Sequence, residues 1–307
     1  MDSAIVIASV LTIMTAATPL VFAALGELIV EKSGVLNLGV EGMMIVGAIC
    51  AFATAVTSGS AFLGIIVGML AGAGLSLLFA ILTQNLMANH VATGLALTIF
   101  GIGLSALIGD GFAGQKLDPL PKGIPGLSDI PVIGPLLFGH DILVYFSIVA
   151  TGAVAWFLTK TRAGMILRAV GDNHDAAHSI GYSVIKIRYM AILFGGAMAG
   201  LGGAYISLAY SPLWAEGMTA GRGWIALALV VFATWKPWRA FLGAYLFGGV
   251  TIIQLIIQGY GINIPAQFLS MLPYLATIVV LVVISRDKYL VKMNAPACLG
   301  KLFHASH

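Results

Sequence analysis

The sequence contains little charge. Of its 307 residues, only 9% are charged whereas 60% are hydrophobic. A soluble globular domain carries roughly 25% charged residues. The composition therefore excludes an ordinary water-soluble domain and indicates an integral membrane protein. The 38 glycines agree with this class, because small residues let helices approach one another closely in lipid.

Cysteine and clustered catalytic groups are also scarce. Cys50 lies in an apolar run and Cys298 in a polar tail, so we expect no disulfide. The pair Gly300-Lys301 is followed by Leu302 and has no upstream glycine at Walker A spacing. Neither a nucleophile motif nor a pair of catalytic carboxylates is visible. We therefore assign no enzymatic reaction and no cofactor to this chain.

The apolar runs have the length that a membrane requires, since a helix needs about 17–25 apolar residues to cross the hydrocarbon core. They predict an all-α polytopic membrane protein with about nine transmembrane helices, within a range of eight to ten, in a single domain over 1–307. The first run is interpreted as a retained span. The predicted spans are 4–26, 38–57, 60–82, 93–109, 142–159, 189–210, 223–235, 240–258 and 271–285.

The distribution of basic residues predicts the topology, because cytoplasmic loops carry the excess of Lys and Arg. We place 160–188 and the tail 286–307 in the cytoplasm, and the proline-rich segment 110–141 outside. Only three basic residues then lie outside: Lys116, Lys122 and Arg222. The N-terminus also falls outside, and we expect the tail to be frayed. The net charge of +3 is scattered between apolar runs and predicts no nucleic-acid partner.

Four polar residues follow the first run. A carboxylate near the bilayer interior is costly unless it is paired, hydrated or protonated. We expect Glu27 and Glu31 to lie in water at the interface. Asn37 and Glu41 stand against the start of the second span, so they are candidates for lining a substrate pathway.

Two amides and a glycine-rich stretch lie inside later spans. Gln254 and Gln258 are one helical turn apart and share a face. They are candidate pathway residues, although hydrogen bonding between helices would also explain them. Gly196 and Gly200 have the spacing of small residues at a helix contact, which predicts packing and not nucleotide binding.

A second polar motif occupies 160–181. Asp172 or Asn173 is placed to cap a short helix and Gly181 to end it. Such a short helix needs a partner surface to be stable. Its small apolar face is predicted to consist of Ala176, Ala177 and Ile180.

His174 and His178 lie one turn apart in this motif. Two imidazoles at this spacing can share a metal ion. Neither a carboxylate nor a thiol completes a convincing set of ligands, so we expect solvated histidines and no metal.

Two stretches together resemble a known family. They are GELIVEKSGVLNLGVEGMM and, after three spans, GMILRAVGDNHDAAHSIGYSVIKIRYMAILFGGAMAGLGGA. In this order they resemble the permeases of the branched-chain amino acid, ribose and nucleoside ABC importers, and are most similar to the nucleoside (guanosine-type) subgroup. The resemblance covers roughly residues 15–285. It implies the type II importer fold in the bacterial inner membrane.

The resemblance also implies partners. They are a second related permease, a cytoplasmic ATPase that uses ATP and Mg, and an extracytoplasmic substrate-binding protein. The cytoplasmic motif would form the coupling helix that docks on the ATPase, through Gly171, Asp172, Asn173, Ala176, Ala177, Ile180 and Gly181.

The substrate implied by the resemblance is a purine nucleoside, with riboflavin-like compounds or simple sugars as alternatives. A secondary transporter is a further alternative, but it should carry acidic residues deep inside several spans. Only Glu41 lies near such a position.

Overall fold

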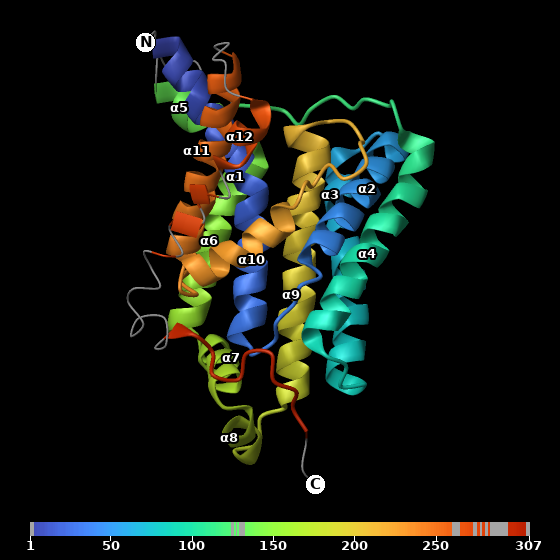
Figure 1. The fold of residues 1–307 in the computed structure, drawn as a ribbon, viewed down its shortest axis with the longest axis vertical. Coiled ribbons are helices and arrows are strands. Elements are labelled where there is room, and N and C mark those ends of the chain that lie inside the picture. The colour runs from blue at the N-terminus through green and yellow to red at the C-terminus, as the bar shows by residue number, and fades with distance from the viewer. Residues whose placement is uncertain are drawn as a thin grey trace.

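A computed structural model describes residues 3–123, 126, 128, 133–259, 265–272, 275, 276, 278, 279, 282 and 294–304. Within these residues the chain is a helical bundle (Figure 1). Seven helices are long and apolar enough to cross a membrane. They are α1 (Ser3–Lys32), α2 (Val40–Ser58), α3 (Ala61–Ala80, continued by the π-helical turn Ile81–Asn85), α4 (His90–Gly109), α6 (Ile142–Lys160), α9 (Val184–Tyr205, continued by the π-helical turn Ile206–Tyr210) and α11 (Pro237–Gly259).

The remaining helices are short. They lie at the ends of the bundle or between the long helices. They are the 3-10 turn Asp110–Phe112, α5 (Ile133–Phe138), α7 (Arg162–Asp172), α8 (His174–Ser179), α10 (Arg222–Phe232) and α12 (Ala266–Ser270).

Seven of the nine predicted spans correspond to the seven long helices. The predicted span 223–235 is wrong as a full crossing, because α10 ends after 11 residues. The chain turns there through Thr234 and Trp235, which have left-handed φ angles of 48° and 53°. Such angles are uncommon for residues other than glycine and cannot continue a helix. Most of the predicted span 271–285 lies outside the described residues.

Glycine contacts hold α9 against α2 and α3. A Cβ atom added to Gly72 of α3 would lie 2.8 Å from the Cα atom of Gly200 and would also collide with the carbonyl oxygen of Gly196. Gly47 of α2 also approaches Gly200 closely. A Cβ atom added to Gly47 would lie 2.5 Å from the Gly200 Cα atom. The predicted packing role of Gly196 and Gly200 is therefore confirmed.

The two predicted sides of the protein lie at opposite ends of the bundle. In Figure 1, α7, α8 and the C-terminal segment lie at one end, whereas α5 and the start of α1 lie at the other. Segment 160–183 and residues 133–138 are thus separated, as the charge pattern requires. Which end faces the cytoplasm stays a prediction from that pattern.

Two glycines of α3 provide a matched test of this packing. We expect Gly72→Ala to destabilise the protein by about 1–3 kcal/mol, because the new methyl group meets backbone atoms that cannot move aside easily. Gly74 has no atom within 4 Å of a hypothetical Cβ, so Gly74→Ala should lose no stability. Thermal unfolding of both variants in one detergent measures the difference. Equal unfolding temperatures would contradict the close α3–α9 contact.

Candidate functional site

The first candidate site surrounds α10, a helix too short to cross a membrane. It lies obliquely across α1 at mid-height in the bundle (Figure 1). The first backbone N–H groups of any helix lack partners within that helix. Inside an apolar bundle these groups must be satisfied by other protein atoms.

Glu41 of α2 satisfies the start of α10. Its Oε1 atom accepts hydrogen bonds from the Thr219 hydroxyl at 2.6 Å and the Gly221 N–H at 2.9 Å. Its Oε2 atom accepts one from the Gly223 N–H at 2.6 Å. A carboxylate is stabilised at a helix N-terminus by the aligned peptide dipoles. Glu41 is only 5% exposed, and both of its oxygens are engaged by the protein.

The end of α10 is held by a carboxylate of α1. The Trp235 indole N–H donates a hydrogen bond of 2.5 Å to Glu31 Oε2. One turn earlier, Glu27 Oε1 accepts a hydrogen bond of 3.1 Å from the Asn37 N–H. Glu27 and Glu31 are each 1% exposed. The expectation that they lie in water is wrong, because α1 continues to Lys32 and other segments cover this part of it.

The four predicted pathway residues lie in the α1–α2 turn, on α2 and on α11. The Asn37 side chain accepts a hydrogen bond of 2.9 Å from the Gly39 N–H and shapes the turn that leads into α2. Gln254 is buried on α11, whereas Gln258 on the same helix is partly exposed. In the described part of the chain, no hydrogen bond joins Asn37 or Glu41 to either glutamine.

The second candidate site is α8, between α7 and α9. The Asn173 side chain accepts a hydrogen bond of 3.0 Å from the Ala176 N–H and caps the helix. Gly181 follows the helix with a left-handed φ of 92°. The predicted short helix and both of its boundaries are therefore confirmed.

The predicted apolar face of α8 is divided between two directions. Ala176 is exposed and Ile180 is 72% exposed, whereas Ala177 is only 3% exposed. The prediction that Ala177 shares one apolar face with Ala176 and Ile180 is thus wrong. Residues of α7, α9 and the C-terminal segment pack around it, namely Val170, Val184 and Phe303.

The C-terminal segment 294–304 is docked on this site, so the expectation of a frayed tail is wrong for these residues. The Cys298 N–H donates to the Gly171 carbonyl at 2.9 Å, and the Gly300 N–H donates to the Gly34 carbonyl at 3.0 Å. The ring of Phe303 lies 5.3 Å, centroid to centroid, from the rings of both His174 and His178.

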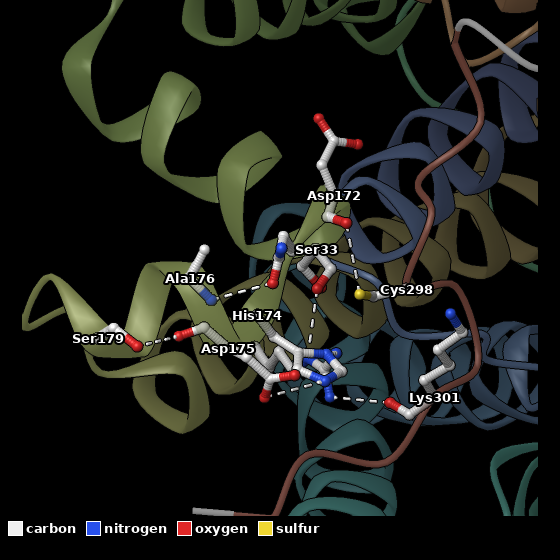
Figure 2. Close-up of polar contacts among 10 residues, drawn as sticks. Ser33, Asp172, His174, Asp175, Ala176, Ser179, Cys298 and Lys301 are labelled. Atoms are coloured by element: carbon white, nitrogen blue, oxygen red, sulfur yellow. Dashed lines mark hydrogen bonds and ion pairs between the residues drawn. The ribbon is translucent and has the colours of Figure 1, made fainter.

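A buried arginine ties these segments together. The Arg188 guanidinium donates hydrogen bonds to the Ser33 carbonyl at 3.3 Å and the Lys301 carbonyl at 3.1 Å. A third contact of 3.2 Å joins it to His174 Nδ1. Figure 2 shows Ser33, His174 and Lys301 converging on one point beside Asp172 and Cys298. A buried cation is tolerated when such partners replace its water.

His174 is buried, so the expectation of a solvated side chain is wrong for it. Burial is the largest cause that lowers the pKa of His174, and the nearby Arg188 guanidinium lowers it further. The Asp175 carboxylate, 3.6 Å from Nε2, opposes this effect. A neutral ring with its proton on Nε2 accepts from Arg188 and donates towards Asp175. Among the described residues, no group of three or more His, Cys, Asp or Glu side chains is placed to hold a metal ion.

Three residues of these sites were missed in the sequence: Arg188, Trp235 and Phe303. Arg188 had a usable signal, since it directly precedes the apolar run 189–210, and a charge at a span boundary requires a partner. Trp235 and Phe303 stand at the ends of apolar or polar runs without any distinguishing pattern.

The seven long apolar helices define the chain as a polytopic membrane protein. The model of a family described as a branched-chain amino acid transport system permease component matches residues 9–284. The chain belongs to this family of ABC importer permeases. It is a multi-pass inner-membrane protein and a permease subunit, not an enzyme, and ATP is hydrolysed by a separate subunit.

Several relatives resemble the chain over most of its length. A provisionally assigned glucose ABC transporter permease of Haloferax volcanii is 41% identical over 87% of this chain and 88% of its own. A nucleoside ABC transporter permease of Lactococcus lactis is 36% identical over 86% and 88%. A guanosine ABC transporter permease of Bacillus subtilis is 33% identical over 86% and 88%. No solved structure matches the chain significantly.

The contacts of Glu41 predict a structural effect of its removal. In Glu41→Gln an amide N–H₂ group replaces one acceptor, so at least one buried N–H at the start of α10 loses its partner. We expect a loss of about 1–3 kcal/mol in stability. Thermal unfolding and the rate of tryptic cleavage at Arg222 measure the global and local effects. Glu216→Gln is the control, because Glu216 is exposed in the segment before α10. If both variants behave like the wild type, Glu41 does not hold α10.

The buried His174 predicts a pH dependence of tail docking. Its folded pKa is lowered, so its contribution is fully present above the unfolded pKa of about 6.5 and is lost as the pH falls below it. In a Cys50→Ala background, labelling of Cys298 reports release of the segment, because this thiol is buried. We expect the labelling rate, relative to that of an additional His174→Gln variant, to stay constant above about pH 6.5 and to rise as the pH falls from there to about 5.5. A constant ratio would contradict this role of His174.

Proposed function

We propose that the chain forms one half of the translocation pathway of an ABC importer for nucleosides, with purine nucleosides as the principal substrates. The other half is a second, related permease. A substrate-binding protein delivers the nucleoside from outside, and a cytoplasmic ATPase that uses ATP and Mg supplies the energy. The observation that carries this proposal is the similarity to a nucleoside permease and a guanosine permease over 86% of the chain.

The interior of the subunit is compatible with a neutral substrate. Glu41 is the acidic residue nearest to the predicted pathway, and both of its carboxylate oxygens accept hydrogen bonds from the start of α10 and the residues just before it. A nucleoside offers base edges and hydroxyl groups, which amides recognise well. Gln258 is the remaining partly exposed candidate for such a contact. We assign Asn37, Glu41 and Gln254 to the wall behind the pathway, because they are buried.

We further propose that α8 receives the ATPase. It projects beyond the long helices at one end of the bundle (Figure 1). Ala176 and Ile180 present an apolar surface that nothing in the described chain covers. Asn173 and Gly181 set the ends of the helix, and Gly171 and Asp172 join it to α7 and to the C-terminal segment.

A second substrate class is glucose, which the 41% identical relative favours. Both classes are neutral and rich in hydroxyl groups, so the described residues do not separate them. In such importers the binding protein selects the substrate, and the permease need only let it pass.

Uptake by the complete transporter in proteoliposomes tests the proposal. We expect ATP-dependent, saturable uptake of labelled guanosine or adenosine, and little uptake of glucose or riboflavin. Gln258→Ala should alter nucleoside uptake and leave complex assembly and basal ATP hydrolysis unchanged, because a side chain in the pathway contacts only the transported substrate. Uptake of glucose without uptake of any nucleoside would contradict the proposed substrate class and favour a sugar.

A further inference from the structure

The docked segment 294–304 connects α8 to the turn between α1 and α2. On the α1 side, the Lys32 ammonium donates a hydrogen bond of 2.7 Å to the Asn294 carbonyl. The Gly300 N–H donates to the Gly34 carbonyl at 3.0 Å. Gly34 has a left-handed φ of 88°, and a Cβ there would lie 3.0 Å from the Arg188 guanidinium. The turn is thus shaped to let the segment and Arg188 approach its backbone.

On the other side, the segment reaches α8 and its neighbour α7. The Cys298 N–H donates to the Gly171 carbonyl at 2.9 Å. Phe303 is buried against Ala177 of α8, and its ring contacts the rings of His174 and His178. These four contacts of the segment lie on the end of α7 and on the inner face of α8.

A helix as short as α8 cannot hold its own conformation. It has six residues, whereas isolated helices shorter than about 12–15 residues are marginal in water. The Asn173 cap fixes its first turn. Its inner face is fixed by what packs on Ala177, and the large side chain there is Phe303.

We propose that segment 294–304 is a strut that holds α8 at a fixed position relative to the α1–α2 turn, with Phe303 as the positioning residue. This inference rests on the proposed function, in which α8 receives the ATPase. When the ATPases move α8, the strut passes the displacement to the end of α1. Without Phe303, α8 can tilt on its own, and ATP is hydrolysed with less transport.

The inference predicts a change in coupling that a merely structural contact would not cause. We expect Phe303→Ala in the complete transporter to lower the amount of substrate transported per ATP by at least about fivefold, the lower end of typical coupling effects between sites. Phe303→Leu should restore most of the ratio, because it refills the space against Ala177. His304→Ala is the matched control, since this neighbouring side chain is exposed, and it should leave the ratio unchanged.

A second variant guards against misfolding of the first. A chain that ends at residue 302 keeps the backbone bonds of Asn294, Cys298, Gly300 and Lys301 but lacks Phe303. It should assemble with its partners, as judged by co-purification, and show the same fall in transport per ATP. Basal hydrolysis should persist in both variants.

A third variant separates the two proposals. Ile180→Glu places a charge on the outer face of α8 and should weaken ATPase binding and transport together. If Ile180→Glu has this effect while the two variants without Phe303 keep the wild-type ratio, the strut is refuted and the ATPase-docking role of α8 stands. If Ile180→Glu assembles and transports normally, α8 is not the docking site and both proposals fail.

Discussion

The constraint on which the structure depends is that polar backbone groups inside an apolar bundle must find partners. A helix that stops within the bundle, as α10 does, exposes such groups at both ends. At the start of α10 the Glu41 carboxylate of α2 accepts hydrogen bonds from the N–H groups. At the end of α10 the carbonyl groups of Val230 and Val231 accept from the N–H groups of Trp235 and Thr234 in the turn that follows. Glu31 of α1 holds that turn by accepting from the Trp235 indole N–H. The break is stable because these partners exist. In turn, α1 and α2 determine where α10 lies.

A related constraint, on a buried side-chain charge, operates near the start of α9. The Arg188 side chain is fully buried. A buried charge without hydrogen-bond partners would strongly destabilise the folded protein. Its partners are carbonyl groups of Ser33 and Lys301 and a ring nitrogen of His174. These residues are distant in sequence. One cation therefore gathers the α1–α2 turn, α8 and the C-terminal segment into one cluster, which would lose its centre if the arginine were removed.

The long helices and α8 could be predicted because their signals are local. An apolar run of sufficient length predicts a span wherever it packs, and Asn173 and Gly181 mark a short helix by their own conformational preferences. The length of α10 could not be predicted, because neither Thr234 nor Trp235 is a residue type that favours the left-handed angles with which the chain turns just after the helix. The inner direction of Ala177 and the docking of Phe303 are also tertiary. Periodicity shows that a short helix has faces, but not which face meets the bundle.

The two candidate sites meet at the last turn of α1. Glu31 receives the Trp235 indole at the end of α10, and the next residue, Lys32, donates to the C-terminal segment. Ser33 then contacts Arg188. Because these residues are consecutive and the helix before them is buried in the bundle, the C-terminal segment and α10 contact the same rigid element. A displacement that reaches the α1–α2 turn from α8 would therefore act on the α10–α11 turn without crossing the rest of the bundle. Packed cores of this kind respond to such displacements by shifting between discrete arrangements. α10, which Glu41 holds at its start and Glu31 at the turn after its end, is the next element that such a displacement would reach.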